Sequence, residues 1–202
     1  MNSDDIAAAA AAVQRGEVVA FPTETFYGLG ADPRQPAALL EVLRLKGRTD
    51  AAKPLLLLAA SLDQVAPWVG TFPPGFDRLA AHFWPGALTL VLPAAPGVPP
   101  PLIGAGGGVA VRLTSQPLAQ RLILACGTAI TGTSANRTER PAAQSAAEVR
   151  AFFGEALAAV VDGGTTAGGE PSTLLQLDSA GARVLRAGAV DVAALRGVVR
   201  LL

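Results

Sequence analysis

Residues 17–30 read EVVAFPTETFYGLG, and the rest of the chain can be interpreted outward from this stretch. Residues 17–21, apolar from Val18 onward, predict a buried strand that Pro22 closes. Two hydroxyls, a carboxylate and a phenol follow at once, on a turn that Gly28 and Gly30 would permit. Ligands bind beyond the carboxyl ends of strands in open sheets, so a binding site is expected here. A turn cap formed by the two threonines is an equally good interpretation.

Apolar periodicity and helix boundary residues outside this stretch predict alternating strands and helices. Helices are predicted over residues 3–16, 36–47, 77–83 and 116–125, from residue 145 onward, and over 192–195. Strands are predicted over residues 55–58, 87–92, 109–113, 128–131, 160–161, 173–177 and 183–185, with a proline-rich and glycine-rich loop over 93–108. This order indicates an α/β or α+β fold, a twisted mixed sheet covered by helices. No repeat or linker divides the chain, so residues 1–202 are expected to form one domain.

The composition of the 202 residues excludes several classes of protein. Sixteen basic residues balance sixteen acidic ones, which disfavours a domain that binds a nucleic-acid duplex through bulk positive charge. A hydrophobic content of 50% excludes a disordered chain. The first five residues are acidic where a signal peptide is basic, and the longest uncharged stretch, 83–111, contains too many prolines for a membrane helix. We therefore expect a cytoplasmic protein with no membrane segment.

Most signatures of covalent or metal chemistry are missing from the sequence. No glycine-rich motif follows a strand and opens a helix, as nucleotide-binding loops require. His82 is the only histidine and Cys126 the only cysteine, which disfavours both a metal cage and a catalytic triad. We expect His82 to be a packed or surface residue and Cys126 a small buried hydrophobe.

Polar groups that suit an anion occur instead at several strand and helix ends. Lys46 and Lys53 are the only lysines, and Lys46 with Arg48 brackets a glycine at a predicted helix end. Such cations hold phosphate oxygens, but they also suit the dipole of a helix C-terminus. Arg112 lies in an apolar strand and needs an anionic partner if it faces inward, for which a substrate carboxylate would serve. Hydroxyls and amides follow strands over 131–136, a polar loop over 162–173 could close over a ligand, and Arg186 stands near the end. Together they predict an anion-binding cleft without a nucleophile.

Five motifs in register resemble the YrdC-like family of threonylcarbamoyl-AMP synthases, over roughly residues 10–190. They read PTETFYGLG at 22–30, KGR at 46–48, WPGALT at 84–89, SAN at 134–136 and LRAGA at 185–189. The length resembles the short bacterial type. The family fold implied by this resemblance is a twisted sheet that encloses a positively charged cavity.

The resemblance implies an ATP-dependent nucleotidyltransferase that joins L-threonine, bicarbonate and ATP into L-threonylcarbamoyl-AMP and releases pyrophosphate. By this resemblance Thr25, Arg112 and Ser172 would hold L-threonine, with Arg112 on its carboxylate. The residues implied for the nucleotide are Lys46, Arg48, Ser134, Asn136 and Arg186, of which Lys46 and Arg48 are the expected catalytic cations. Mg²⁺ would bind through the ATP phosphates, with no metal site in the protein. The product would serve the t6A modification of tRNA at position 37, which links the chain to a tRNA threonylcarbamoyl-transferase complex.

The chain departs from the family pattern at three places. Thr49 follows the lysine–arginine motif where proline is frequent, and Thr138-Glu139 stand where a Ser-Gly pair is usual. Leucines fill residues 55–58, where some members carry a histidine that contributes to threonine binding. Two other functions stay open: a non-catalytic module that binds double-stranded RNA or assists ribosome maturation, which the zero net charge disfavours, and a paralogue that adenylates another carbamoylated substrate.

Overall fold

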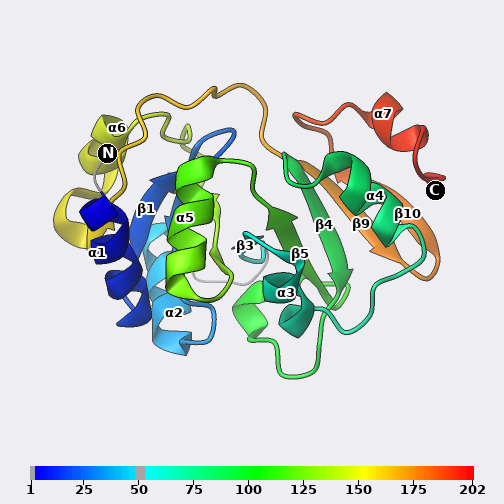
Figure 1. Ribbon diagram of the computed structural model, residues 1–202, viewed down its shortest axis with the longest axis horizontal. Helices are drawn as coiled ribbons and strands as arrows, with labels where there is room; N and C mark the ends of the chain where they lie inside the picture. The colour runs from blue at the N-terminus through cyan, green and yellow to red at the C-terminus, as the bar shows by residue number, and fades with distance from the viewer. Residues whose placement is uncertain (1–2, 49–52) are drawn as a thin grey trace.

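The computed structural model describes residues 3–48 and 53–202, and its strands form two mixed sheets (Figure 1). The helices are α1 (Ser3–Gln14), α2 (Pro36–Leu45), α3 (Leu62–Val65), α4 (Phe76–Phe83), α5 (Pro117–Cys126), α6 (Ala146–Phe153) and α7 (Val192–Arg196). The strands are β1 (Val19–Pro22), β2 (Tyr27–Gly30), β3 (Leu57–Ala59), β4 (Leu88–Pro93), β5 (Gly108–Leu113), β6 (Ile130–Thr131), β7 (Thr133–Ser134), β8 (Ala159–Val160), β9 (Thr173–Asp178) and β10 (Gly181–Arg186). Short 3₁₀ turns occupy Ala66–Trp68, Pro100–Leu102 and Gly154–Ala156.

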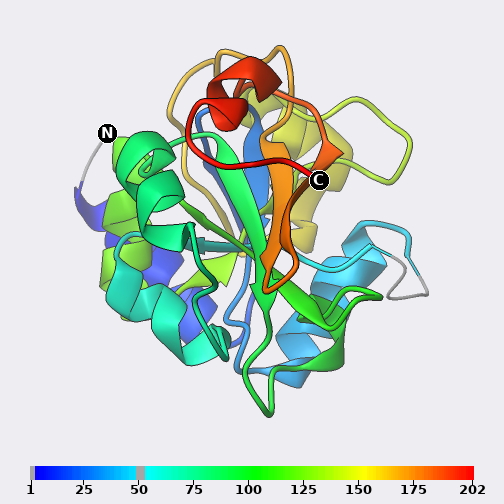
Figure 2. The same ribbon diagram turned by 90° about the vertical axis from the view of Figure 1, so that its right-hand side faces the viewer.

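The smaller sheet has the strand order β7-β2-β1-β8 and the larger one β10-β9-β4-β5-β3-β6. In the smaller sheet β1 pairs antiparallel with β2 and parallel with β8. In the larger sheet β4 lies between antiparallel β5 and parallel β9, and β3 pairs parallel with β5. Figure 2 shows α3 and α4 on one side of the larger sheet and α2 on the other. The fold class expected from the sequence is confirmed, with the strands divided between two sheets.

Two apolar cores follow from the amino-acid pattern of the helices. The alanine-rich α1 presents small side chains such as Ala9 and Val13 to Leu122 of α5 and to Phe21 of β1, so these elements pack closely together. The second, larger core lies between α2, α4 and the strands of both sheets, and includes Leu39 and Leu90. The alanine run is therefore a packing surface as well as a strong helix-forming sequence.

The chain passes directly from the larger sheet to the smaller one at Gly132. Thr131 ends β6 and Thr133 begins β7, so a single residue separates strands of different sheets. The Gly132 amide donates to the carbonyl oxygen of Leu56 at 2.8 Å. A Cβ atom at this position would lie 2.2 Å from Leu58 Cδ1 and 3.3 Å from Leu58 Cβ. A glycine at this link therefore lets the chain pass close to the Leu58 side chain of β3.

The structure corrects parts of the sequence interpretation. Gly28 and Gly30 lie within β2 and not in a turn, and the turn itself occupies residues 23–26. Gly30 is instead a close-packing position, because a Cβ there would lie 2.7 Å from the Phe21 ring. Helix α3 and strand β7 are absent from the elements predicted above, because a four-residue helix and a two-residue strand show no periodicity in the sequence.

We predict that Gly132→Ala lowers the free energy of unfolding by about 1–3 kcal/mol, because the added methyl group overpacks against Leu58 in β3. Urea denaturation monitored by circular dichroism measures this change. Gly106→Ala is the matched control, since a Cβ there meets nothing within 4 Å, and its effect should stay within about 0.5 kcal/mol. Equal stability of the two variants would contradict the close approach at Gly132.

Candidate active site

A cavity of about 700 Å³ is lined by residues of both sheets. Its wall contains six residues that the sequence resemblance singled out: Thr25, Arg48, Arg112, Ser134, Ser172 and Arg186. The other two, Lys46 and Asn136, are bonded to Ser134 directly behind this wall. Residues from Thr25 to Arg186 therefore lie around one cavity, the arrangement that an anion-binding cleft would need.

The C-terminus of α2 places Lys46 and Arg48. The Gly47 amide donates to Arg44 O and the Arg48 amide to Leu43 O, while Gly47 has a φ of 65°. These are the bonds of a Schellman motif, in which the residue after the helix takes a left-handed conformation that favours glycine. Lys46 and Arg48 consequently leave the helix end on either side of a sharp turn.

The Lys46 side chain is buried, with only 1% of the residue exposed. Its ammonium group donates to the Ser134 backbone oxygen, to Ser134 Oγ at 3.2 Å and to Asn136 Oδ1 at 2.6 Å. All these acceptors are neutral. Burial, and secondarily the charge of Arg48, lower the pKa of Lys46 to about 7. Lys46 therefore fixes the serine and asparagine of the SAN motif and has no carboxylate among these partners.

Thr138 connects the lysine–arginine motif to the segment after β7. Arg48 Nε donates to Thr138 Oγ1 at 3.0 Å, and that hydroxyl donates to Lys46 O at 3.0 Å. Arg48 Nη1 also donates to Lys53 O at 3.0 Å, which holds the guanidinium at the cavity edge. The departure at residue 138 thus supplies a hydroxyl that positions Arg48. Thr49, the other departure in this motif, lies outside the described residues.

The turn between β1 and β2 is capped by its first threonine and places the second one in the cavity wall. Thr23 Oγ1 donates to Phe26 O at 2.6 Å and accepts from the Thr25 amide at 3.3 Å, so Thr23 caps the turn. Thr25 then lies in the cavity wall with 8% of its surface exposed. Capping by the first threonine presents the second one to the cavity.

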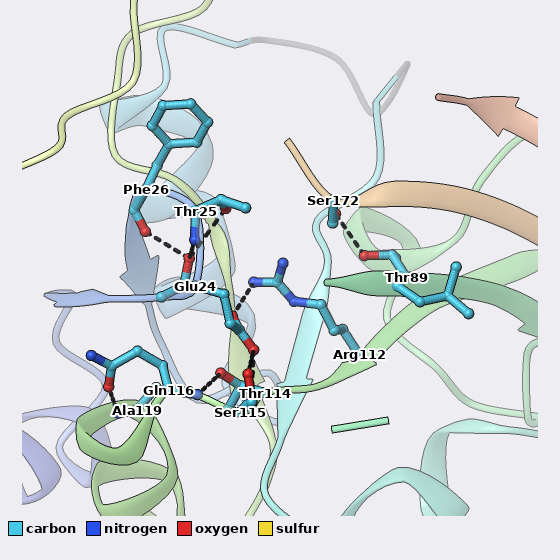
Figure 3. Close-up of polar contacts among 12 residues, drawn as sticks. Glu24, Thr25, Phe26, Thr89, Arg112, Thr114, Ser115, Gln116, Ala119 and Ser172 are labelled. Atoms are coloured by element: carbon cyan, nitrogen blue, oxygen red, sulfur yellow. Dashed lines mark hydrogen bonds and ion pairs between the residues drawn. The ribbon is translucent and has the colours of Figure 1, made fainter. Parts of the chain in front are cut away.

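Arg112 and Glu24 form a buried ion pair that is incompletely bonded. Arg112 Nη2 lies 3.5 Å from Glu24 Oε2, and 3% of the arginine is exposed (Figure 3). Glu24 Oε1 accepts from the amide and hydroxyl of Ser115. Burial lowers the pKa of Arg112, and the charge of Glu24 opposes this. Arg112 Nε and Glu24 Oε2 are the only buried side-chain polar atoms without a hydrogen-bond partner among the described residues.

This unsatisfied pair points to a ligand. Unbonded buried polar groups are rare in native proteins because each costs about 1–3 kcal/mol. A bound anion would supply the acceptor that Arg112 Nε lacks. The sequence predicts that Arg112 needs an anionic partner if it faces inward. It does not identify Glu24 as the charge beside it, since the two residues are 88 positions apart.

Ser172 and Arg186 stand together at the other side of the cavity. Arg186 Nη2 donates to Ser172 O at 2.8 Å and lies 3.4 Å from Ser172 Oγ. Ser172 Oγ is also 2.8 Å from Thr89 Oγ1, and both hydroxyls are buried (Figure 3). Thr89 ends the WPGALT motif, but the sequence alone gave its hydroxyl no role.

The polar segment 162–172 crosses from the smaller sheet to the larger one at the top of Figure 1. Tyr27 holds it there, because its phenol donates to Gly164 O at 2.7 Å and accepts from the Gly163 amide at 3.0 Å. The Gly168 amide donates to Thr25 O at 2.8 Å. The Tyr27 phenol, expected among the ligand-binding groups, is therefore bonded to this segment.

The remaining candidates behave as packing or surface residues. Cys126 is buried, which raises the pKa of its thiol to about 12, and His82 is exposed with its ring near Arg78 O. No group of three His, Cys, Asp or Glu side chains suited to a metal occurs within residues 3–48 and 53–202. In the same part of the chain, every helix is too short or too polar to cross a bilayer.

Comparison with known proteins agrees with this geometry. The model of the Sua5/YciO/YrdC family, described as "Telomere recombination", matches residues 11–188. The chain belongs to this family. The resemblance found in the five sequence motifs is therefore confirmed, and the family match extends from within α1 to the residues just after β10.

Two curated members of the family illustrate the similarity. A threonylcarbamoyl-AMP synthase of Thiobacillus denitrificans is 44% identical over 175 residues, which is 87% of this chain and 91% of that protein. A threonylcarbamoyl-AMP synthase of Alkalilimnicola ehrlichii is 47% identical over 76% of this chain and 79% of that protein. The chain thus spans most of the length of these short family members.

Solved structures of the family share the fold. Sua5 of Pyrococcus abyssi, solved with L-threonine, superposes with a TM-score of 0.91 at 36% identity. The alignment covers 98% of this chain and 58% of that longer protein. YciO of E. coli superposes with a TM-score of 0.82 over 93% of this chain and 90% of that protein, and its 24% identity supports the fold alone.

We predict a pH dependence of stability from the buried lysine. The pKa of Lys46 is about 7 in the folded chain and about 10.4 in the unfolded one, so between these values the unfolded state binds the extra proton. Without ligands, the free energy of unfolding of the wild type relative to Lys46→Met should therefore rise from pH 7 to pH 10. Urea titrations of both proteins across this range measure it, and a pH-independent difference would contradict the shifted pKa.

Proposed function

We infer that this chain is a nucleotidyltransferase that makes L-threonylcarbamoyl-AMP from L-threonine, bicarbonate and ATP and releases pyrophosphate. The observation that carries this inference is the buried Arg112, whose Nε lacks an acceptor in the wall of a cavity that also contains cations suited to phosphate. The curated synthases, 44–47% identical over most of the chain, support the same activity.

We propose that L-threonine lies between the smaller sheet and the larger one, on Thr25, Arg112 and Ser172. Its carboxylate would accept from Arg112 Nε, the donor that has no partner in the free chain. A charge-assisted hydrogen bond of this kind is about twice as strong as one between neutral groups. Thr25 and Ser172 lie in the wall of the same cavity, and so does Leu56, from the stretch 55–58 where some relatives carry a histidine.

The nucleotide is proposed to lie along the side of the cavity that holds Arg48, Ser134 and Arg186. Arg48 and Arg186 offer guanidinium groups to the phosphates, and the hydroxyl of Ser134 is suited to a phosphate or ribose oxygen. Lys46 and Asn136 fix Ser134 from behind and, in the case of Lys46, add a positive charge close to the site. Binding of phosphate groups would raise the pKa of Lys46 and keep the ammonium charged.

The proposed reaction needs positioning and charge, and it needs no nucleophilic side chain. The amine of L-threonine and bicarbonate give a carbamate and water, and an oxygen of the carbamate attacks the α-phosphorus of ATP while the bond to pyrophosphate breaks. Negative charge moves onto the leaving phosphates in the transition state. Lys46 and Arg48, the proposed catalytic cations, would stabilise that charge at the phosphate side of the cavity.

The donor set fits Mg²⁺ bound through ATP and does not fit a metal cage of the protein. Among the described residues no acidic cluster is present, and Glu24 is already bonded to Ser115 and paired with Arg112. Mg²⁺ bound to the phosphates would supply charge neutralisation there, while the residues of this chain orient the reactants.

The product would be consumed in the t6A modification of tRNA position 37. A mixed anhydride of this type is labile, so a tRNA threonylcarbamoyl-transferase complex is the expected receiver. The zero net charge of the chain favours a link through the small molecule over direct binding of RNA. We propose that residues 1–202 act as one cytoplasmic domain in this pathway.

We predict pyrophosphate release that requires both L-threonine and bicarbonate, measured with a coupled pyrophosphatase assay on the purified protein. Lys46→Ala and Arg48→Ala should abolish it, because both remove charge at the phosphates. Arg44→Ala is the matched control: it removes an exposed arginine of the same helix that pairs with Glu41, and activity should be retained. Release without threonine, or no release by the wild type, would contradict the proposed function.

We predict that Arg112→Lys raises the KM for L-threonine at least tenfold, because lysine keeps the charge beside Glu24 but lacks the planar fork for a carboxylate. The KM for ATP should change less than twofold. Steady-state kinetics with each substrate varied in turn separate the two values. Equal increases for both substrates would show that Arg112 does not bind threonine specifically.

A further inference from the structure

The hydroxyl of Thr89 is a feature that neither the motifs nor the proposed substrate contacts explain. Thr89 lies on β4 with 1% of its surface exposed, and its side chain lines the cavity. Along the same strand, Val91 also lines the cavity, while Leu88 and Leu90 pack into the apolar core. Valine would fit position 89 as well as it fits position 91, so packing alone does not explain the hydroxyl of Thr89.

The contact that this hydroxyl makes is with Ser172. Thr89 Oγ1 and Ser172 Oγ are 2.8 Å apart, a normal distance for a hydrogen bond between hydroxyls. The backbone of Ser172 is held independently, because its carbonyl oxygen accepts from Arg186 Nη2 at 2.8 Å. The Thr89 contact is the shorter of the two that the Ser172 hydroxyl makes, since Arg186 Nη2 lies 3.4 Å away, and it therefore has the larger part in directing this hydroxyl.

Counting hydrogens shows what the pair can offer a ligand. Two hydroxyls carry two hydrogens, and one of them lies between the two oxygens. Arg186 Nη2 lies 3.4 Å from Ser172 Oγ and presents another hydrogen to that oxygen, whose two lone pairs can accept from both Thr89 and Arg186. With Thr89 as the donor, the hydrogen of Ser172 is left for an acceptor inside the cavity, and the bond from Thr89 polarises it.

We propose that Thr89 is a positioning residue for amino-acid binding: it donates to Ser172 and so directs the Ser172 hydroxyl toward an oxygen of the bound L-threonine. This inference rests on the proposed function, which places L-threonine on Ser172. Thr89 acts through Ser172 and touches no reacting atom. Removal of its hydroxyl should therefore weaken the binding of L-threonine. The binding of the nucleotide should be unaffected, because Arg186, its proposed contact, keeps its bond to Ser172 O.

The test compares Thr89→Val with Thr89→Ser. Valine has the shape of threonine without the hydroxyl, whereas serine keeps it. We expect Thr89→Val to raise the KM for L-threonine five- to tenfold, the effect of one buried hydrogen bond, with kcat and the KM for ATP changed less than twofold. Thr89→Ser should restore the KM for L-threonine to within about twofold of the wild-type value.

Thr173→Val is the control for a merely structural role. Thr173 is also buried and its hydroxyl bonds Val190 O at 2.7 Å, but its side chain does not line the cavity. This variant should unfold at lower urea concentration and keep the wild-type KM for L-threonine.

The outcomes separate this inference from the proposed function. A wild-type protein that releases no pyrophosphate with L-threonine overturns the proposed function itself. An active wild type whose KM for L-threonine is unchanged in Thr89→Val overturns the role of Thr89. An equal rise in the KM of both substrates, or failure of Thr89→Ser to rescue, shows that residue 89 serves only packing and overturns it as well.

Discussion

The burial of two cations, Lys46 and Arg112, is the constraint on which the site depends. Both side chains lie within or directly behind the cavity wall, where water cannot solvate their charge. The three acceptors of Lys46 are neutral oxygens, and the contact between Arg112 and Glu24 is long. A buried charge without good partners is costly. Without a ligand, the chain bears the free-energy cost of burying these charges beside the cavity. An anionic substrate bound there would lower that cost.

Besides the shared apolar core, three connections between the two sheets lie beside the cavity and bring these cations together. Gly132 lets the chain pass from the larger sheet to the smaller one within a single residue. Glu24 contacts Arg112 and Ser115 across the gap between the sheets, and the segment 162–172 spans this gap from the other side. Each of these connections also carries or contacts a proposed ligand-binding residue. Part of the interface between the sheets is therefore built from the same contacts as the site.

Much of this arrangement could be predicted from the sequence, and the missing part has a physical explanation. The strand before Pro22, the glycine after α2 and the inward arginine at 112 are local signals, and each was interpreted from its neighbours. The short strands β6 and β7 gave too little periodicity to show that the chain changes sheets at Gly132. Glu24 and Thr89 could not be assigned because their partners are 88 and 83 residues away. Such pairings become visible only once the topology is known.

We propose that Arg112 Nε, which has no acceptor in the free chain, donates to the carboxylate of a bound amino acid. A crystal structure of the chain with L-threonine and a non-hydrolysable ATP analogue tests it most directly. We expect the threonine carboxylate to lie within hydrogen-bond distance of Arg112 Nε and the phosphates to lie near Arg48 and Arg186. A threonine carboxylate bound elsewhere, with Arg112 Nε still lacking an acceptor, would contradict it.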